Sequence, residues 1–189
     1  MAHAPPRLSD RTTNPDRSVR ARSPWPLQVR FGVGFLSLTL LFAILTSTSA
    51  AQRLLHDPLS RLVVSLAAPI LSILGTVSAA GTDLTFNGFA VSIVEACNGV
   101  LPTYIFVSAV LAFPSHWREK GIGMLIGIPS IMLVNVLRVV TLLCFGAYWP
   151  SLFERVHIYV WQALVIAISL AIWVFWAERF VRPSLRTDS

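Results

Sequence analysis

The sequence predicts an all-α integral membrane protein with about four transmembrane helices, one helix embedded in the outer leaflet and a short outer-face β-hairpin. Of the 189 residues, 54% are apolar and 13% are charged, whereas soluble domains carry about 25% charged residues. The mean hydropathy of +0.67 also excludes disorder for most of the chain. The net charge of +6 comes mainly from Arg residues between the apolar stretches. That arrangement orients a protein in a bilayer and does not indicate a nucleic-acid partner.

Residues 1–30 are basic and rich in proline. They hold six Arg and five Pro, a composition typical of a solvated, disordered arm. The twenty residues from Phe31 to Ala50 are uncharged and mostly apolar, enough to cross a bilayer core of about 30 Å as a helix. Ser49-Ala50-Ala51 resembles a signal-peptidase site, but a cleaved signal has a shorter apolar region, so we expect an uncleaved anchor.

Four more apolar stretches follow. Cys97–Phe113, Gly121–Phe145 and His157–Ala177 each predict a crossing, the second with Arg138 inside it. The fourth, Leu62–Ala80, is amphipathic and fits either a span or an embedded helix that does not cross. Small polar residues lie on one side of it, namely Ser65, Ser72 and Thr76. Apolar residues lie on the other side at helical spacing, namely Leu62, Leu66, Ile70, Ile73 and Val77.

The distribution of Lys and Arg decides between these alternatives, because cytoplasmic loops carry the excess. With the arm in the cytoplasm and Arg138 set aside, four crossings put eleven basic residues inside and three outside, whereas five crossings give seven on each side. We therefore predict four crossings, with Leu62–Ala80 in the outer leaflet or packed against the bundle there. Residues 31–180 then form one membrane domain between the arm and a cytoplasmic tail, residues 181–189.

A β-hairpin is expected on the outer face, just before Cys97. Apolar residues flank Asn87-Gly88, the dipeptide best suited to the positive φ angles of a type I′ turn. They are Leu84, Phe86, Phe89, Val91 and Ile93.

Three reactive or charged side chains reach one leaflet under this topology. Cys97 opens the second span at its outer end, Arg138 lies about two turns below the outer end of the third, and His157 opens the fourth. An Arg in a membrane helix costs about 2.5 to 3.5 kcal/mol on insertion scales, so it usually faces a cavity or a partner. The alternative is that Arg138 snorkels and only anchors its helix. Asn135 favours the first interpretation, because residues i and i+3 share a helix face.

Cys97 lies in the segment Glu95–Pro102, which reads as a strand-to-helix junction, with Pro102 suited to a first helical turn. A helix N-terminus and a nearby Arg favour a thiolate, and an imidazole such as His157 could act as its base. Taken alone, Cys97 fits a small apolar residue of a membrane helix better. A disulfide with Cys144 is another alternative, although the apolar run around Cys144 indicates a lipid-facing or packed thiol.

Other chemistries lack their motifs in this sequence. It contains no His-Glu-x-x-His, no Gly-x-Ser-x-Gly and no Gly-x-x-x-x-Gly-Lys, and no cofactor is expected. His56 is placed in a loop, and His3 and His116 on the cytoplasmic side.

Ala96-Cys97-Asn98-Gly99, Asn135-x-x-Arg138 and His157 ahead of a last apolar span resemble the exosortase/archaeosortase family of membrane transpeptidases. The resemblance covers roughly residues 60 to 180 and is to compact members such as the exosortase H type. Asn98 is a departure, because the family usually has Ser after the cysteine.

The resemblance implies a cysteine protease or transpeptidase in the cell inner membrane, with its site facing the periplasm. Its partners would be exported proteins with a C-terminal sorting signal made of a short motif, a membrane helix and a basic cluster. Cys97 would be the nucleophile that forms a thioester, His157 the base and then the acid, and Arg138 the oxyanion donor. Asn135, Asn98 and Glu95 would support them. A rival interpretation is a non-enzymatic, four-span assembly factor or lipid-binding protein in which Arg138 holds a lipid phosphate.

Overall fold

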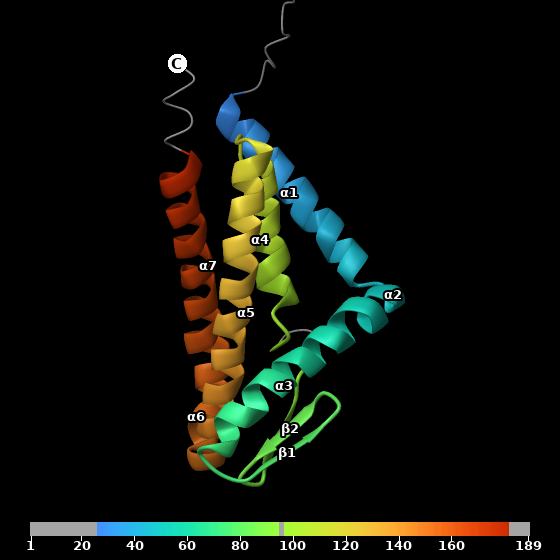
Figure 1. The fold of residues 1–189 in the computed structure, drawn as a ribbon, viewed down its shortest axis with the longest axis vertical. Helices are drawn as coiled ribbons and strands as arrows, with labels where there is room; N and C mark the ends of the chain where they lie inside the picture. The colour runs from blue at the N-terminus through green and yellow to red at the C-terminus, as the bar shows by residue number, and fades with distance from the viewer. Residues whose placement is uncertain (1–25, 95–96, 182–189) are drawn as a thin grey trace, which may run out of the picture.

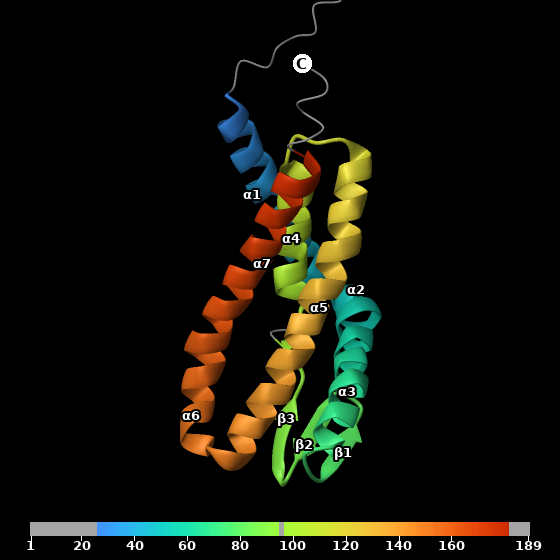
Figure 2. The ribbon, with the colours of Figure 1, turned by 60° about the vertical axis from the view of Figure 1, so that its left-hand side comes forward.

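The computed structural model describes residues 26–94 and 97–181, and in these ranges the chain is mostly helical with one small sheet. Helices α1 (Leu27–Thr46), α4 (Val100–Ala112), α5 (Trp117–Tyr148) and α7 (Gln162–Trp176) gather in a bundle (Figures 1 and 2). The sheet lies at one end, which we call the sheet end, and α1 begins at the opposite end. The predicted class, an all-α membrane protein with a short hairpin, is confirmed.

Helix α1 begins and ends four residues earlier than the predicted span Phe31–Ala50. Its first turn takes up the last four residues of the predicted arm, directly after Pro26. At its other end, the hydroxyls of Thr46, Ser47 and Thr48 donate to backbone carbonyls three or four residues earlier, at 2.8 to 2.9 Å. Such bonds compete with the helical pattern, so the helix stops before Ala50.

The chain then continues through α2 (Ser49–Ala51) and the π-helical turn η1 (Gln52–His56) into α3 (Asp57–Ser72). The prediction of a helix over Leu62–Ala80 is wrong beyond Ser72, because Val77–Ala80 forms strand β1. The Asn87 side chain accepts a hydrogen bond from the Thr76 N–H at 2.9 Å and ties the start of this strand to the hairpin turn.

The buried face of α3 is not the predicted apolar stripe. It packs against the sheet and α5 through Ser60, Val63, Val64, Ala67 and Leu71. The stripe itself is exposed at Leu62, Leu66, Ile70 and Ile73, which is compatible with the predicted contact with lipid.

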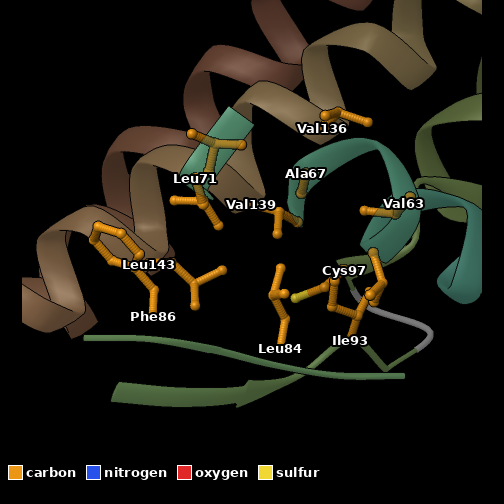
Figure 3. Close-up of a cluster of buried hydrophobic side chains, with 12 residues drawn as sticks. Val63, Ala67, Leu71, Leu84, Phe86, Ile93, Cys97, Val136, Val139 and Leu143 are labelled. Atoms are coloured by element: carbon orange, nitrogen blue, oxygen red, sulfur yellow. The ribbon is translucent and has the colours of Figure 1, made fainter. Parts of the chain in front are cut away.

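The sheet has three antiparallel strands in the order β1-β2-β3, with β2 Asp83–Phe86 and β3 Phe89–Ser92. The hairpin prediction is confirmed: Leu84 pairs with Val91, and Asn87 and Gly88 both have positive φ angles, +46° and +86°. Strand β1 was not anticipated. Leu84 and Phe86 are fully buried against α3 and α5, so the sheet forms one wall of a core (Figure 3).

Within residues 26–94 and 97–181, four helical stretches are long and apolar enough to cross a bilayer: Leu27–Thr46, Ser49–Ser72, Trp117–Tyr148 and Pro150–Val181. The number of stretches agrees with the four predicted crossings, but the segments are not the same ones. Length and composition select the stretch that ends with α3, which was expected not to cross. It leaves out α4, whose 13 residues rise about 20 Å.

Packing nevertheless groups α4 with the other bundle helices. It contacts α1, α5 and α7, whereas α3 contacts α5 and the sheet. In Figure 1, α1 runs obliquely and ends at the level where α4 begins, and α3 covers only the sheet-end half of α5. Helices α1 and α4 therefore lie in the half of the molecule away from the sheet, whereas α5 continues to the sheet end, where it contacts β2 and β3.

Two glycines four residues apart let α5 approach its neighbours closely. A Cβ atom at Gly123 would lie 2.7 Å from the indole nitrogen of Trp176 on α7, and one at Gly127 would collide with the ring of Phe106 on α4. Small residues at this spacing are a common means of close packing between membrane helices. This contact fixes α5, and with it Arg138, against α4 and α7.

Candidate active site

Cys97 lies in a tight turn between the sheet and α4. Its N–H donates to the Val94 carbonyl at 2.8 Å, and the side-chain oxygen of Asn98 accepts from the Val100 N–H at 3.1 Å. Gly99 has φ +84°, a left-handed conformation that favours glycine. The turn therefore aims the cysteine back toward the core between α3, the sheet and α5.

The Cys97 side chain is 8% exposed and belongs to that core. Figure 3 shows it beside Ile93 and Leu84 at the edge of the cluster. The thiol thus contributes more packing than expected for a residue at a helix start.

His157 meets the thiol from another helix. Its Nε2 atom lies 3.8 Å from the Cys97 Sγ, and its ring packs against Phe153 with centroids 5.7 Å apart. It lies in the π-helical turn η3 (Val156–Trp161), between α6 (Pro150–Arg155) and α7. Such turns are frequent at functional sites, and this one turns the imidazole toward the cysteine.

Arg138 on α5 is only 6% exposed, and its Nε atom has no hydrogen-bond partner. Its guanidinium interacts electrostatically with both Cys97 and His157. A snorkelling arginine keeps its head in water, so this burial argues against an anchoring role. An unpaired buried N–H is costly and is available to a bound group.

Asn135 supports the cysteine turn directly. Its side-chain nitrogen donates to the Cys97 carbonyl at 2.7 Å, and a Cβ atom at Gly99 would lie 3.2 Å from its amide carbon. The sequence placed Asn135 on one stripe with Arg138, and the structure adds this contact with the turn.

Asn98 contacts a residue that sequence reasoning missed. Its side-chain nitrogen lies 3.0 Å from Nδ1 of His56, which is 3% exposed, and Nε2 of His56 lies 3.0 Å from the Thr46 carbonyl. The predicted topology already placed His56 on the outer face together with Cys97 and His157. That shared face is the feature of the sequence that could have identified His56 as a site residue. Glu95, the remaining proposed site residue, lies outside the described residues.

The second cysteine is separate from this cluster of polar residues. Cys144 is half-buried and packs against the core from α5. Both cysteines are free thiols, so the alternative of a disulfide between them is not realised.

An apolar cavity of about 400 Å³ adjoins the site. Its walls come from α1, α4, α5 and α7, and most of its lining is aromatic or aliphatic. Leu101 and Pro102, in the first turn of α4 after Cys97, line it, as do Arg138 and Gln162. The buried guanidinium therefore faces a space that an apolar ligand could fill.

Metal binding finds no support in the ranges 26–94 and 97–181, where no group of three His, Cys, Asp or Glu side chains could hold an ion. The chemistry available here is that of a thiol, an imidazole and a guanidinium. That combination suits nucleophilic acyl transfer, in which a base activates the thiol and a cation stabilises an oxyanion.

A family model described as transmembrane exosortase (Exosortase_EpsH) matches residues 26–175. The chain belongs to the exosortase family. The match covers the bundle, the sheet and the positions of Cys97, Arg138 and His157, and the family supports a membrane transpeptidase or sorting role. Comparisons with curated proteins and with solved structures gave no match.

Proposed function

We propose that this exosortase is a membrane-embedded cysteine protease or transpeptidase that cleaves the C-terminal sorting signal of exported proteins. The observation that carries the proposal is the 3.8 Å approach of Cys97 Sγ to His157 Nε2, with the buried Arg138 charge acting on both. The three residues come from three separate elements: Cys97 from the turn before α4, Arg138 from α5 and His157 from η3. Their convergence supports a shared chemical role beyond helix packing.

Each residue has one task in the proposed reaction. His157 Nε2 takes the Cys97 proton as Sγ attacks the scissile carbonyl carbon, and the N–H donors of Arg138 stabilise the resulting oxyanion. When the oxyanion collapses, the C–N bond breaks and the leaving amine takes the proton from His157. The product is a thioester between Cys97 and the substrate, which water or an amine acceptor then attacks to release the thiol.

The apolar cavity supports a substrate that is itself embedded in the membrane. Its lining runs from Leu101 and Pro102, in the first turn of α4, to Phe31 on α1 and Trp173 on α7. A membrane helix lying there would present the residues ahead of it to Cys97. We therefore assign this surface to the membrane helix of the sorting signal.

The charge distribution supports an orientation in which the sheet end faces the periplasm and the cell inner membrane surrounds the bundle. In this arrangement α1, α4, α5 and α7 cross the bilayer, and α3 lies at the outer boundary with its stripe of Leu62, Leu66, Ile70 and Ile73 toward lipid. The 13 residues of α4 rise about 20 Å, and the turn that begins this helix is linked to the end of α1 through His56.

The decisive experiment is co-expression of the full chain with an exported protein that carries a C-terminal sorting signal and a tag on each side of it. We expect a size shift with the wild type and none with Cys97→Ser, while Cys144→Ser processes normally. Normal processing by Cys97→Ser would refute the proposal.

A lipid-binding role is the second candidate, favoured by the unpaired Arg138 Nε at an apolar cavity. Here Arg138 would hold a lipid phosphate and Cys97 would be inert. Thiol alkylation separates the two functions. A catalytic Cys97 should react faster than Cys144 and lose that advantage in His157→Ala, whereas an inert one should not depend on His157.

A further inference from the structure

The structure links the residue after the nucleophile to the end of the first helix through one buried histidine. His56 is 3% exposed and Asn98 is fully buried. Their side chains meet at 3.0 Å between Asn98 Nδ2 and His56 Nδ1, and Thr46 O lies 3.0 Å from His56 Nε2. Asn98 is 42 positions from His56 in the sequence, and none of the three residues takes part in the proposed reaction.

Only one assignment of protons satisfies every partner in this chain of bonds. The Val100 N–H can donate only to an oxygen, which fixes the Asn98 amide with Oδ1 toward Val100 and Nδ2 toward His56. Nδ1 of His56 must then accept, so the ring proton lies on Nε2 and is donated to the Thr46 carbonyl. That carbonyl ends α1 and, like the last carbonyls of any helix, has no partner within the helix.

The cysteine turn is therefore held from two sides. Asn135 on α5 binds the Cys97 carbonyl at 2.7 Å, and His56 holds the adjacent Asn98 from the opposite element. We propose that His56 is a positioning residue, which acts through Asn98 to set where Cys97 Sγ stands relative to His157. This inference rests on the proposed function for its catalytic consequence, although the coupling itself can be measured on the thiol alone.

The π-helical turn η1 is compatible with this role. His56 is its last residue, and π-helical turns recur where a side chain has a functional position. His157, on the other side of the thiol, also lies in a π-helical turn. In this interpretation a π-helical turn positions both imidazoles: His157 contacts the sulfur of Cys97, and His56 holds the adjacent Asn98.

Asn98→Ser separates the two bonds of Asn98. A serine can still accept from the Val100 N–H and keep the turn, but its shorter side chain cannot reach His56. His56→Phe removes the same link from the other side. His56→Gln keeps one acceptor and one donor on a side chain of similar length and serves as the conservative variant.

The experiment measures the rate at which iodoacetamide alkylates Cys97 in full-length protein in membranes, in a Cys144→Ala background. Substrate processing is followed in parallel. We expect His56→Phe and Asn98→Ser each to slow both rates about fivefold, the loss of one buried hydrogen bond. The double variant should be no slower than the slower single, because both changes break one link. His56→Gln should remain within about twofold of the parent protein.

Ser60→Ala is the matched control, since Ser60 is buried one turn beyond His56, in α3, which continues directly from η1. It should leave both rates unchanged. If His56→Phe does not accumulate, Asn98→Ser and His56→Gln carry the test.

Losses that multiply in the double variant would overturn the inference, as would single variants that alkylate at the parent rate or a Gln variant as slow as Phe. Failure of the proposed function looks different. In that case Cys97→Ser would process substrate normally, whatever the alkylation rates show.

Discussion

Replacing Arg138 by Lys tests whether the buried guanidinium takes part in the reaction or only supplies charge. Arg presents five N–H donors in a fixed plane, whereas Lys offers three on one atom. Because Nε of Arg138 has no partner within the described protein, a substrate oxyanion could use two parallel donors of Arg but only one of Lys.

The expected loss follows from these numbers of donors. Removing one oxyanion donor costs about 10²- to 10³-fold in rate, and Lys retains the charge and a single donor. We therefore expect Arg138→Lys to lower kcat/KM for processing at least about tenfold, or about 1.4 kcal/mol of transition-state stabilisation. The Lys stem keeps most of the apolar contact with the cavity wall, so accumulation in membranes should stay normal.

The assay is a time course of the substrate's size shift at matched enzyme levels, with the Cys97→Ser variant as the inactive control. Arg155→Lys is the matched control, because Arg155 is exposed on α6 close to His157 in sequence. It should process at the wild-type rate. Arg138→Lys kinetics within twofold of wild type would remove the guanidinium from the mechanism and leave only Cys97 and His157.

Cys97→Ser should abolish processing with near-normal abundance, whereas Cys144→Ala should be almost silent; equal damage from both, in processing and abundance, would indicate a packing role. Asn135→Ala should slow processing about fivefold, the effect of one hydrogen bond lost from the Cys97 carbonyl; an unchanged rate would show that this bond does not position the thiol. Gly127→Ala should reduce the thermal stability of the purified protein, because its methyl group collides with a Phe ring, and an unaltered melting temperature would contradict the close contact. A cysteine at position 188 should resist impermeant maleimides in intact cells; labelling from outside would refute the four-span topology.

The parts of this fold that sequence could predict are those set by local chemistry. Asn87-Gly88 specifies its hairpin because the positive φ angles are a property of those two residues. Strand β1 was not predicted, because Ser78, Ala79 and Ala80 have no strong preference for a strand. They become a strand only through pairing with β2, a contact that no periodicity within the segment encodes.

The candidate site divides in the same way. Cys97, Arg138 and His157 stood out because a charged or reactive side chain near an apolar span has few neutral explanations. His56 did not stand out, since its role depends on an asparagine 42 positions away. Hydrophobic periodicity also failed for the buried face of α3, because apolar residues lie on more than one side of this helix and only its packing shows which side is buried.

The level of the Cys97 turn has a consequence for substrate choice. The turn lies where α1 ends and α4 begins and is linked to α1 through His56, so in the proposed function the nucleophile would have a fixed depth in the bilayer. An extended chain covers about 3.3 to 3.6 Å per residue, and each residue between a substrate's scissile bond and its membrane helix therefore moves that bond by this amount. The enzyme would then select substrates by the number of residues between the motif and the membrane helix as well as by the motif itself. A substrate with the correct motif a few residues too far from its helix would not bring its scissile bond to the thiol and would not be cleaved.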